Sequence, residues 1–441
     1  MKKSLLGMTA LFGLTAGVAL AEDVKVTFNG SSTFEAGARK VDRDHKAPFS
    51  YSPNQKSTAF YTMQQASLKA EGKSDTLTYG AVLRLQMVAN SDDAGDYTNS
   101  RSYIYLDTDS GSVQLGSNYA VSKMLKIDAG TIASATGGVD GDWTNFANVS
   151  AINPSFTLNG KNITNVRWNG LSTNSAAQDS RIVSSMADSL AIQRVDTLSN
   201  RLDSGESARK ITYLSPRISG LQIGLSFIPD LGNTGSNNFL TKDNINDDGT
   251  ISLVNNMYMG SPVRVKNLWS LGLNYTNTFN DIAVGLSAGA DKGKANKQTI
   301  TYTDVNKQDQ STTLAYRDLK TYSIGGSVGT KGFTLAASYQ NDGKSLTLAS
   351  EDRFKASWWT VGLAYAQDKM TTSISYLAGK KGTDDLNVTT KLVSLGADYE
   401  VVPGMTPFTE ITMIQMKPKS INSDDSRSKS TVFILGTKLK F

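Results

Sequence analysis

The chain has 441 residues, of which 39% are hydrophobic, and it carries 45 basic and 40 acidic side chains and no cysteine. A net charge of +5 on a chain of this length excludes a nucleic-acid binder that depends on a strongly basic surface, and the lack of cysteine excludes a fold held by disulfides. No stretch of 18 consecutive apolar residues follows the N-terminal segment, which excludes helical membrane spans. A soluble chain of this size with 39% hydrophobic residues would nevertheless have too few apolar side chains for its core.

The N-terminus has the three parts of a secretory signal. Two lysines precede an apolar stretch from Leu5 to Leu20, and small residues surround a cleavage point after Ala21. Removing residues 1–21 takes away two lysines and no acid, so 43 basic and 40 acidic side chains remain. We therefore expect a signal peptide at 1–21 and a mature chain, 22–441, that works outside the cytoplasm.

The mature chain reads as a series of segments in which apolar side chains alternate with small or polar ones. Side chains two apart share a face of a strand, so this alternation predicts strands with one apolar face. A first strand is expected from Val24 to Lys40. Hairpins are then expected for Phe60–Ala70 with Leu77–Ala89, Arg101–Leu106 with Val113–Tyr119, Ile211–Leu214 with Leu221–Phe227, Leu271–Tyr275 with Ile282–Ala290, Tyr322–Val328 with Phe333–Tyr339, and Trp359–Tyr365 with Thr372–Tyr376.

The remaining expected strands lie near the C-terminus. Val393–Val401 leads through Pro403 into Thr406–Met416, and the chain then ends in a last strand that stops on Phe441. On that strand Phe433, Leu435 and Leu439 share a face with the terminal phenylalanine. An edge strand of a soluble β-protein would explain this segment taken alone, but an apolar aromatic end suits a membrane border.

The strands number about sixteen, each of roughly ten residues, and short turns alternate with long polar connections, as in single-chain outer-membrane barrels. Aromatic residues on the apolar faces fall at the two ends of the strands: Tyr275, Tyr365 and Tyr399 beside short turns, and Tyr339, Trp359 and Tyr376 at the opposite ends. Two such rings are typical of the two membrane interfaces, whereas a soluble β-sandwich or β-solenoid adhesin would bury its large aromatics in mid-strand. The sequence therefore predicts an all-β fold, a transmembrane antiparallel β-barrel.

The third long connection is much longer than ordinary loops: about ninety residues separate the strand that ends near Tyr119 from the strand that starts near Lys210. Within it, apolar residues from Ile182 to Leu202 are spaced like one face of a short helix. The other long connections are expected at Val41–Lys56, Asn90–Ser100, Gly232–Val265, Asp291–Asp318, Gln340–Lys355, Ala378–Asn387 and Lys417–Ser428.

Three stretches resemble the Gram-negative general porin family, and the alphaproteobacterial porins in particular. They are Arg101–Gly116, the Tyr213–Asp230 hairpin, and the terminal Phe441, which resembles the assembly signal of the family. The resemblance implies a homotrimer of sixteen-stranded barrels in the outer membrane, whose third loop folds into the lumen. It also implies outer-membrane lipid, lipopolysaccharide and the barrel-assembly machinery as partners. The third connection is about twice as long as in most relatives.

The alternation places four basic residues on the lumen side: Arg39, Lys69, Arg84 and Arg101. A charge on the lipid face would cost roughly 2–4 kcal/mol at mid-bilayer, so the inward side is strongly favoured. The resemblance implies that these residues form the basic wall of a constriction. Simple solvation in a wet lumen would place them inward equally well.

The acidic side of such a constriction is expected in the third connection. There, the glycine and acid stretch from Gly137 to Trp143 resembles the loop tip of the family, which points to Asp140 and Asp142, with Asp128 preceding them. A simple surface turn is the alternative interpretation of this stretch.

Other chemistry is sparse. The only histidine, His45, lies in the first polar connection and is expected to be solvated. The stretch from Asn244 to Gly249 is similar to a calcium loop, but Asn255 stands where a bidentate glutamate is needed. We therefore predict no enzyme activity, no cofactor and no metal site, and a polar turn at this stretch, with a weak surface cation site there as the alternative.

The sequence as a whole favours a passive, water-filled channel for small hydrophilic solutes and ions. A substrate-specific channel would need a line of lumenal aromatics, for which only Tyr103 and Tyr105 are candidates. A barrel anchor or adhesin with a plugged lumen is the other alternative, in which the third connection would be the plug.

Overall fold

The computed structural model describes residues 24–43, 57–90, 96–146, 156–158, 161–163, 208–231, 243–244, 265–295, 298–303, 309–346, 349, 355–382, 387–419 and 428–441. The expected signal peptide, His45, the helical spacing at 182–202 and most of the calcium-like stretch lie outside these residues. No helix among the described residues has both the length and the apolar character needed to cross a membrane.

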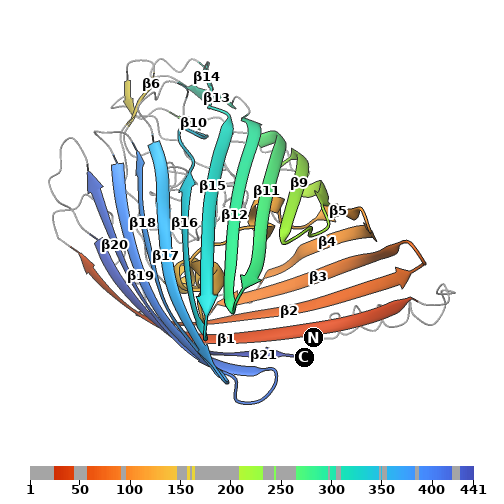
Figure 1. The fold of residues 1–441 in the computed structure, drawn as a ribbon. Helices are drawn as coiled ribbons and strands as arrows, with labels where there is room; N and C mark the ends of the chain where they lie inside the picture. Colours follow the sequence, from red (N-terminus) through yellow and green to blue (C-terminus); the bar gives the residue numbers. More distant parts are fainter. Residues whose placement is uncertain are drawn as a thin grey trace, which may run out of the picture.

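Sixteen strands form one closed antiparallel barrel (Figure 1), which confirms the predicted fold class. Each strand pairs with the next in the barrel order, and β1 pairs with β21 to close it. The barrel strands are β1 (Lys25–Arg43), β2 (Thr58–Lys73), β3 (Thr78–Asn90), β4 (Asp96–Thr108), β5 (Gly111–Ser117), β8 (Arg209–Leu214), β9 (Leu221–Asp230), β11 (Val265–Phe279), β12 (Ile282–Ala295), β15 (Leu319–Thr330), β16 (Phe333–Asn341), β17 (Lys355–Gln367), β18 (Met370–Gly382), β19 (Asn387–Tyr399), β20 (Met405–Lys419) and β21 (Ser428–Lys440).

The predicted hairpins are present, but most strands are longer than the roughly ten residues expected from the apolar band. β1 has 19 residues, and β11 and β20 have 15 each. The reason is that backbone pairing continues past the apolar positions into the polar connections, where alternation no longer reports the strand. For the same reason the connection expected at Asp291–Asp318 contains β13 (Gln298–Thr303) and β14 (Asp309–Leu314), which form a small sheet with β10 (Asp243–Asn244).

The outer face of the barrel carries the large hydrophobic side chains, as the alternation predicted. Phe28, Leu85, Ile104 and Leu435 are all exposed on it. The two aromatic belts are visible as ring contacts between neighbouring strands. The ring centroids of Phe333 and Tyr365, near the short turns, are 4.4 Å apart, and those of Trp359 and Tyr376, near the long connections, are 5.1 Å apart.

The C-terminal residue completes the seam between β1 and β21. The backbone N–H of Phe441 donates to Gly30 O at 3.0 Å, and the N–H of Gly30 donates to Phe441 O at 2.7 Å. A Cβ atom at Gly30 would lie 2.2 Å from the Phe441 ring, so the ring covers this glycine on the outer face. The terminal aromatic is therefore packed on the first strand at the point where the barrel closes.

We predict that Gly30→Val weakens this closure, since a side chain at Gly30 must displace the Phe441 ring, and overpacking costs about 1–3 kcal/mol. The temperature at which the folded band converts to the unfolded band in SDS gels should fall. Gly326→Val is the control, because a Cβ there, also on the outer face, meets no atom closer than 3.2 Å. Equal transition temperatures for the two variants would contradict the assigned role of the seam.

Candidate pore constriction

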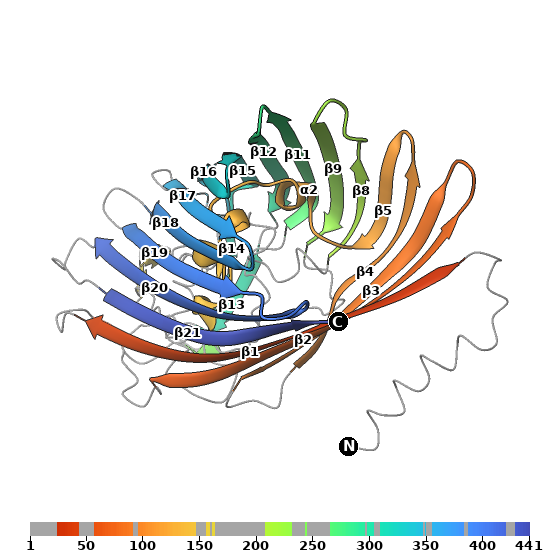
Figure 2. The ribbon, with the colours of Figure 1, turned by 60° about the horizontal axis from the view of Figure 1, so that its bottom comes forward.

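Part of the segment between β5 and β8 enters the barrel and follows its inner wall. This part, residues 120–146, which we call the inner loop, contains α2 (Val121–Met124), the 3-10 turns η2 (Gly130–Ile132) and η3 (Gly138–Asp140), and α3 (Trp143–Phe146); further along the segment, β6 (Phe156–Leu158) and β7 (Lys161–Ile163) pair in a separate two-stranded sheet. In chain order these contact β9, β11 and β12, then β16 and β17, then β18 and β19, and finally β21, β1 and β2 (Figure 2). Residues 120–146 of the third connection are thus folded inward, as expected.

The wall leaves room for the inner loop because its inward positions there have little or no side chain. A Cβ at Gly325 on β15 would lie 1.9 Å from Ile127 O, and one at Gly272 on β11 would lie 2.6 Å from Val121 O. The backbone of the loop therefore occupies the space that larger side chains would fill. Any larger residue at these positions must push the loop away from the wall.

Hydroxyl groups on the same wall satisfy the backbone of the inner loop. Six of its N–H groups donate to serine and threonine oxygens in this way: Val121 N to Ser226 Oγ at 3.3 Å, Ser122 N to Ser270 Oγ at 3.2 Å, Ile127 N to Ser287 Oγ at 2.9 Å, Ala129 N to Thr360 Oγ1 at 3.3 Å, Ser134 N to Ser373 Oγ at 2.8 Å, and Val139 N to Ser375 Oγ at 3.1 Å. Buried N–H groups need such partners, so the bonds fix the path of the loop.

The tip of the inner loop is held by charged side chains. Glu410 on β20, only 1% exposed, accepts from Thr136 N at 3.1 Å and from Thr136 Oγ1 at 2.8 Å. Asp398 on β19 accepts from Ala135 N at 2.9 Å, and Lys438 on β21 donates to Ala135 O. Side chains of three neighbouring strands thus hold residues 135 and 136 of the inner loop.

A second carboxyl group lies beside this attachment. Glu35 on β1 is fully buried, and neither of its oxygens has a hydrogen-bond donor among the described residues. It faces the carboxyl group of Asp142, and Glu410 and Lys438 also act on it electrostatically. The acids and one lysine therefore meet where the inner loop passes from β20 to β1.

Two strands further along the barrel from β1, β3 and β4 bring two predicted residues together. Arg84 and Arg101 are direct cross-strand partners on the inner face. Like charges in this position repel, which is tolerated where water or polar groups surround them. Arg84 donates to Gln65 Oε1, and the Arg101 guanidinium lies 4.0 Å from the centre of the Tyr119 ring.

Lys69 lies on the inner face of β2 and is bound to an acid that was not predicted as a site residue. Its Nζ is 2.6 Å from Glu71 Oε2, which also accepts from Tyr105 Oη at 2.7 Å. Tyr105 is buried on the lumen side and Tyr103 is partly buried beside it, with their ring centroids 6.4 Å apart. Both tyrosines thus lie where the alternation placed them.

The other predicted residues bind the inner loop or lie within it. Arg39 on β1 donates to Phe146 O at 3.1 Å. Asp128 is fully buried and pairs with Lys126 at 2.6 Å, and Asp140 lies 3.6 Å from the same lysine. The structure therefore groups Asp128 with Asp140 at Lys126, and groups Asp142 with Glu35.

Part of the inner wall is apolar, which differs from the polar lumen face expected from the sequence. Leu377, Leu392 and Ile434, on β18, β19 and β21, belong to a buried cluster with Trp143 and Phe146 of the inner loop. The physical reason is that the loop packs on these strands, so that this part of the wall is a protein core and not a water-lined surface.

Glu35, Glu410 and Lys438 were not predicted from the sequence, and neither were the glycines on which the loop lies. A signal for them was present, since an acid at an inward strand position, or a series of inward glycines and serines, indicates contact with another part of the chain. Among the described residues, no group of three or more side chains is arranged to hold a metal ion.

Comparison with known proteins places this architecture in a family. Residues 7–418 match the Gram-negative porin family. A protein of Rickettsia conorii described as uncharacterized is 29% identical over 476 residues, and one of Rickettsia prowazekii is 28% identical over 478 residues, each alignment covering 100% of both chains.

Two solved structures have a similar fold. The loop L8 deletion mutant of OmpT, an outer membrane protein of Vibrio cholerae, gives a TM-score of 0.52 at 13% identity, and the trimer form of in-vitro folded OmpT gives 0.51 at 13%, each covering 95% of this chain and 100% of the other. At such identities the likeness concerns the fold alone. The match over nearly the whole chain establishes the family that the sequence resembled: this protein is a member of the Gram-negative porins.

Proposed function

We propose that the protein is a passive, water-filled outer-membrane channel for small hydrophilic solutes and ions. The observation that carries this proposal is the path of the inner loop, which is bonded along the inner wall from β9 to β1 and does not cross the barrel. A loop held in this way narrows a passage while leaving its centre to solvent.

In this proposal the basic wall consists of Lys69, Arg84 and Arg101 on β2, β3 and β4. Glu71 pairs with Lys69, so the net positive charge comes mainly from the two arginines. Fixed positive charge in a narrow passage raises the local concentration of anions, so the channel favours anions. Arg39, Asp128 and Asp142 have a different task, since their contacts hold the shape of the inner loop and so set the width of the passage. Asp128 and Asp140 share the single Lys126, so these three groups together keep one negative charge on the inner loop.

The same proposal includes the assembly and location of the chain. The segment 1–21 directs export and is cut after Ala21, and Phe441 is recognised by the barrel-assembly machinery. The barrel then lies among outer-membrane lipids and lipopolysaccharide as a homotrimer. The trimer form of in-vitro folded OmpT supports the last step by analogy of fold.

A second candidate is a barrel anchor with a plugged lumen. The observation in its favour is the buried apolar cluster between the inner loop and β17–β21, because such packing inside a barrel is what a plug requires. A plug blocks conduction, so one measurement distinguishes the two functions.

We predict that the protein reconstituted in planar bilayers gives stepwise, ohmic conductance that increases in proportion to bulk salt. The steps should come in groups of three if the protein is a trimer. Insertions that stay silent at all voltages, with folding shown by migration in SDS gels, would contradict the channel and favour the plugged anchor.

The width of the passage should depend on Gly325. Gly325→Val places a side chain where Ile127 O now lies, so the inner loop must move toward the barrel axis, and single-channel conductance should fall. Gly326→Val, at the next residue on the outer face, should keep the parent conductance. If the two variants conduct equally, the inner loop does not limit the passage.

Ion preference should depend on the arginine pair. Arg84→Gln together with Arg101→Gln should shift the reversal potential in a salt gradient toward cations, because the fixed positive charge is lost. The shift should shrink at high salt, where the Debye length falls to about 3 Å at 1 M. Lys331→Gln, at an exposed short turn, removes a charge far from β3 and β4 and is the control. If the double variant has the same reversal potential as the control, Arg84 and Arg101 do not lie at the narrowest part of the passage.

A further inference from the structure

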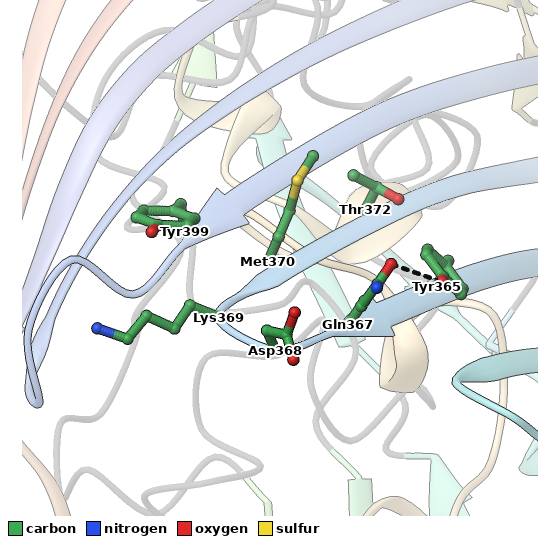
Figure 3. A pocket seen from close by; sticks show the side chains of 7 residues that line it. All are labelled: Tyr365, Gln367, Asp368, Lys369, Met370, Thr372 and Tyr399. Atoms are coloured by element: carbon green, nitrogen blue, oxygen red, sulfur yellow. Dashed lines mark hydrogen bonds between the residues drawn. The ribbon is translucent and has the colours of Figure 1, made fainter.

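A notch lies on the outer surface of the barrel at the end of β17, β18 and β19. Its volume is about 480 Å³, and it is lined by Tyr365, Gln367, Asp368, Lys369, Met370, Thr372 and Tyr399. Figure 3 shows Tyr399 and Lys369 on one side of the β17–β18 turn and Tyr365 and Gln367 on the other. The volume is within the range of about 300–1,000 Å³ that ligand pockets have.

The register shows that the notch faces the membrane and not the lumen. Met370 is the cross-strand partner of both Gln367 and Tyr399, and Thr372 is the partner of Tyr365. Tyr365 belongs to the outer aromatic belt through its contact with Phe333, and Met370 and Tyr399 are exposed. The notch therefore opens into lipid.

Its depth in the membrane follows from the turn. Only two residues, Asp368 and Lys369, connect β17 to β18. Short turns of outer-membrane barrels lie on the periplasmic side, and tyrosines of the aromatic belts lie at the level of the lipid headgroups. The notch is thus at the headgroup level of the inner leaflet, with its apolar side chains toward the acyl chains.

The chemistry of the notch matches the parts of a lipid. Lys369 Nζ donates to Val401 O at 3.2 Å, and an ammonium group has three donors, so donors remain for a phosphate. Asp368, next to it, offers a carboxylate to a headgroup amine. Gln367, whose Oε1 accepts from Tyr365 Oη at 2.8 Å, supplies amide donors, while Met370 and the tyrosine rings form an apolar floor.

We infer that this notch binds one phospholipid of the inner leaflet with a zwitterionic, amine-bearing headgroup. The phosphate lies at Lys369 and Gln367, the headgroup amine lies at Asp368, and the start of an acyl chain lies on Met370. A purely anionic headgroup fits less well, since the Asp368 carboxylate would face it without a positive partner. The site is independent of the lumen and of the channel proposed above.

The test is native mass spectrometry of the purified barrel titrated with phosphatidylethanolamine and with phosphatidylglycerol. The parent should bind one phosphatidylethanolamine per chain in preference to phosphatidylglycerol. Lys369→Gln should weaken binding of both lipids about tenfold, the effect of losing one charge-assisted hydrogen bond. Asp368→Asn should weaken phosphatidylethanolamine binding alone.

Control variants outside the notch and a variant that fills the notch complete the test. Lys331→Gln and Asp281→Asn change the same residue types at exposed short turns outside the notch and should bind lipid like the parent. Thr372→Trp fills the notch without changing any charge and should abolish binding of both lipids. All variants must first show the folded band in SDS gels.

The inference is overturned if Lys369→Gln and Lys331→Gln bind lipid with the same affinity. It is also overturned if the parent does not prefer phosphatidylethanolamine over phosphatidylglycerol, or if Asp368→Asn keeps the parent's preference. It is also overturned if Thr372→Trp changes the number of chains in the assembly, since the notch would then be a contact between copies of the chain.

Discussion

The need to satisfy buried backbone groups inside the barrel governs this structure. A loop that enters a closed barrel takes its N–H groups away from bulk water, and each one left unpaired would cost about 1–3 kcal/mol. Oxygens on most of the strands from β9 to β20 accept from these N–H groups, beginning with Ser226 on β9 and ending with Glu410 on β20. Because the inward positions between these oxygens are glycines such as Gly325, the loop backbone can approach closely enough to use them. The shape of the lumen therefore follows from the inner face of the strands.

The ionisable side chains of the inner face differ between the strands that the inner loop covers and the strands that it leaves uncovered. Where the inner loop covers the wall, ionisable groups are bonded to the loop: Glu410 is buried, and Asp398 and Lys438 are partly buried. Between the two ends of the loop, on β2 to β4, the ionisable groups are mainly basic and only partly buried. A charged side chain on a strand covered by the loop thus binds the loop, whereas one on an uncovered strand faces the solvent of the passage. Asp128, which is buried within the loop, accordingly forms a local ion pair with Lys126.

Much of the fold could be predicted because strand alternation is a local property. The hairpins at Ile211–Leu214 and Leu271–Tyr275, the inward side of Arg84 and Arg101, and the outer face of the last strand all follow from side chains two residues apart. The strand ends could not be predicted, since the backbone ladder continues after the apolar pattern stops. The attachment of Thr136 to Glu410 could not be predicted either, because it joins positions 274 residues apart through the register of a closed barrel.

The lipid face and the lumen face can change separately, because neighbouring residues of one strand serve different surroundings. On β15, Gly325 makes room for the loop while Ile324 and Gly326 face outward. On β18, Ser375 and Ser373 hold the loop, while Met370 and Thr372 line the outer notch. The same antiparallel register thus positions a constriction on one side and a lipid-facing surface on the other. The family fold supplies the register, and the residues of this chain at alternate positions determine what each face can bind.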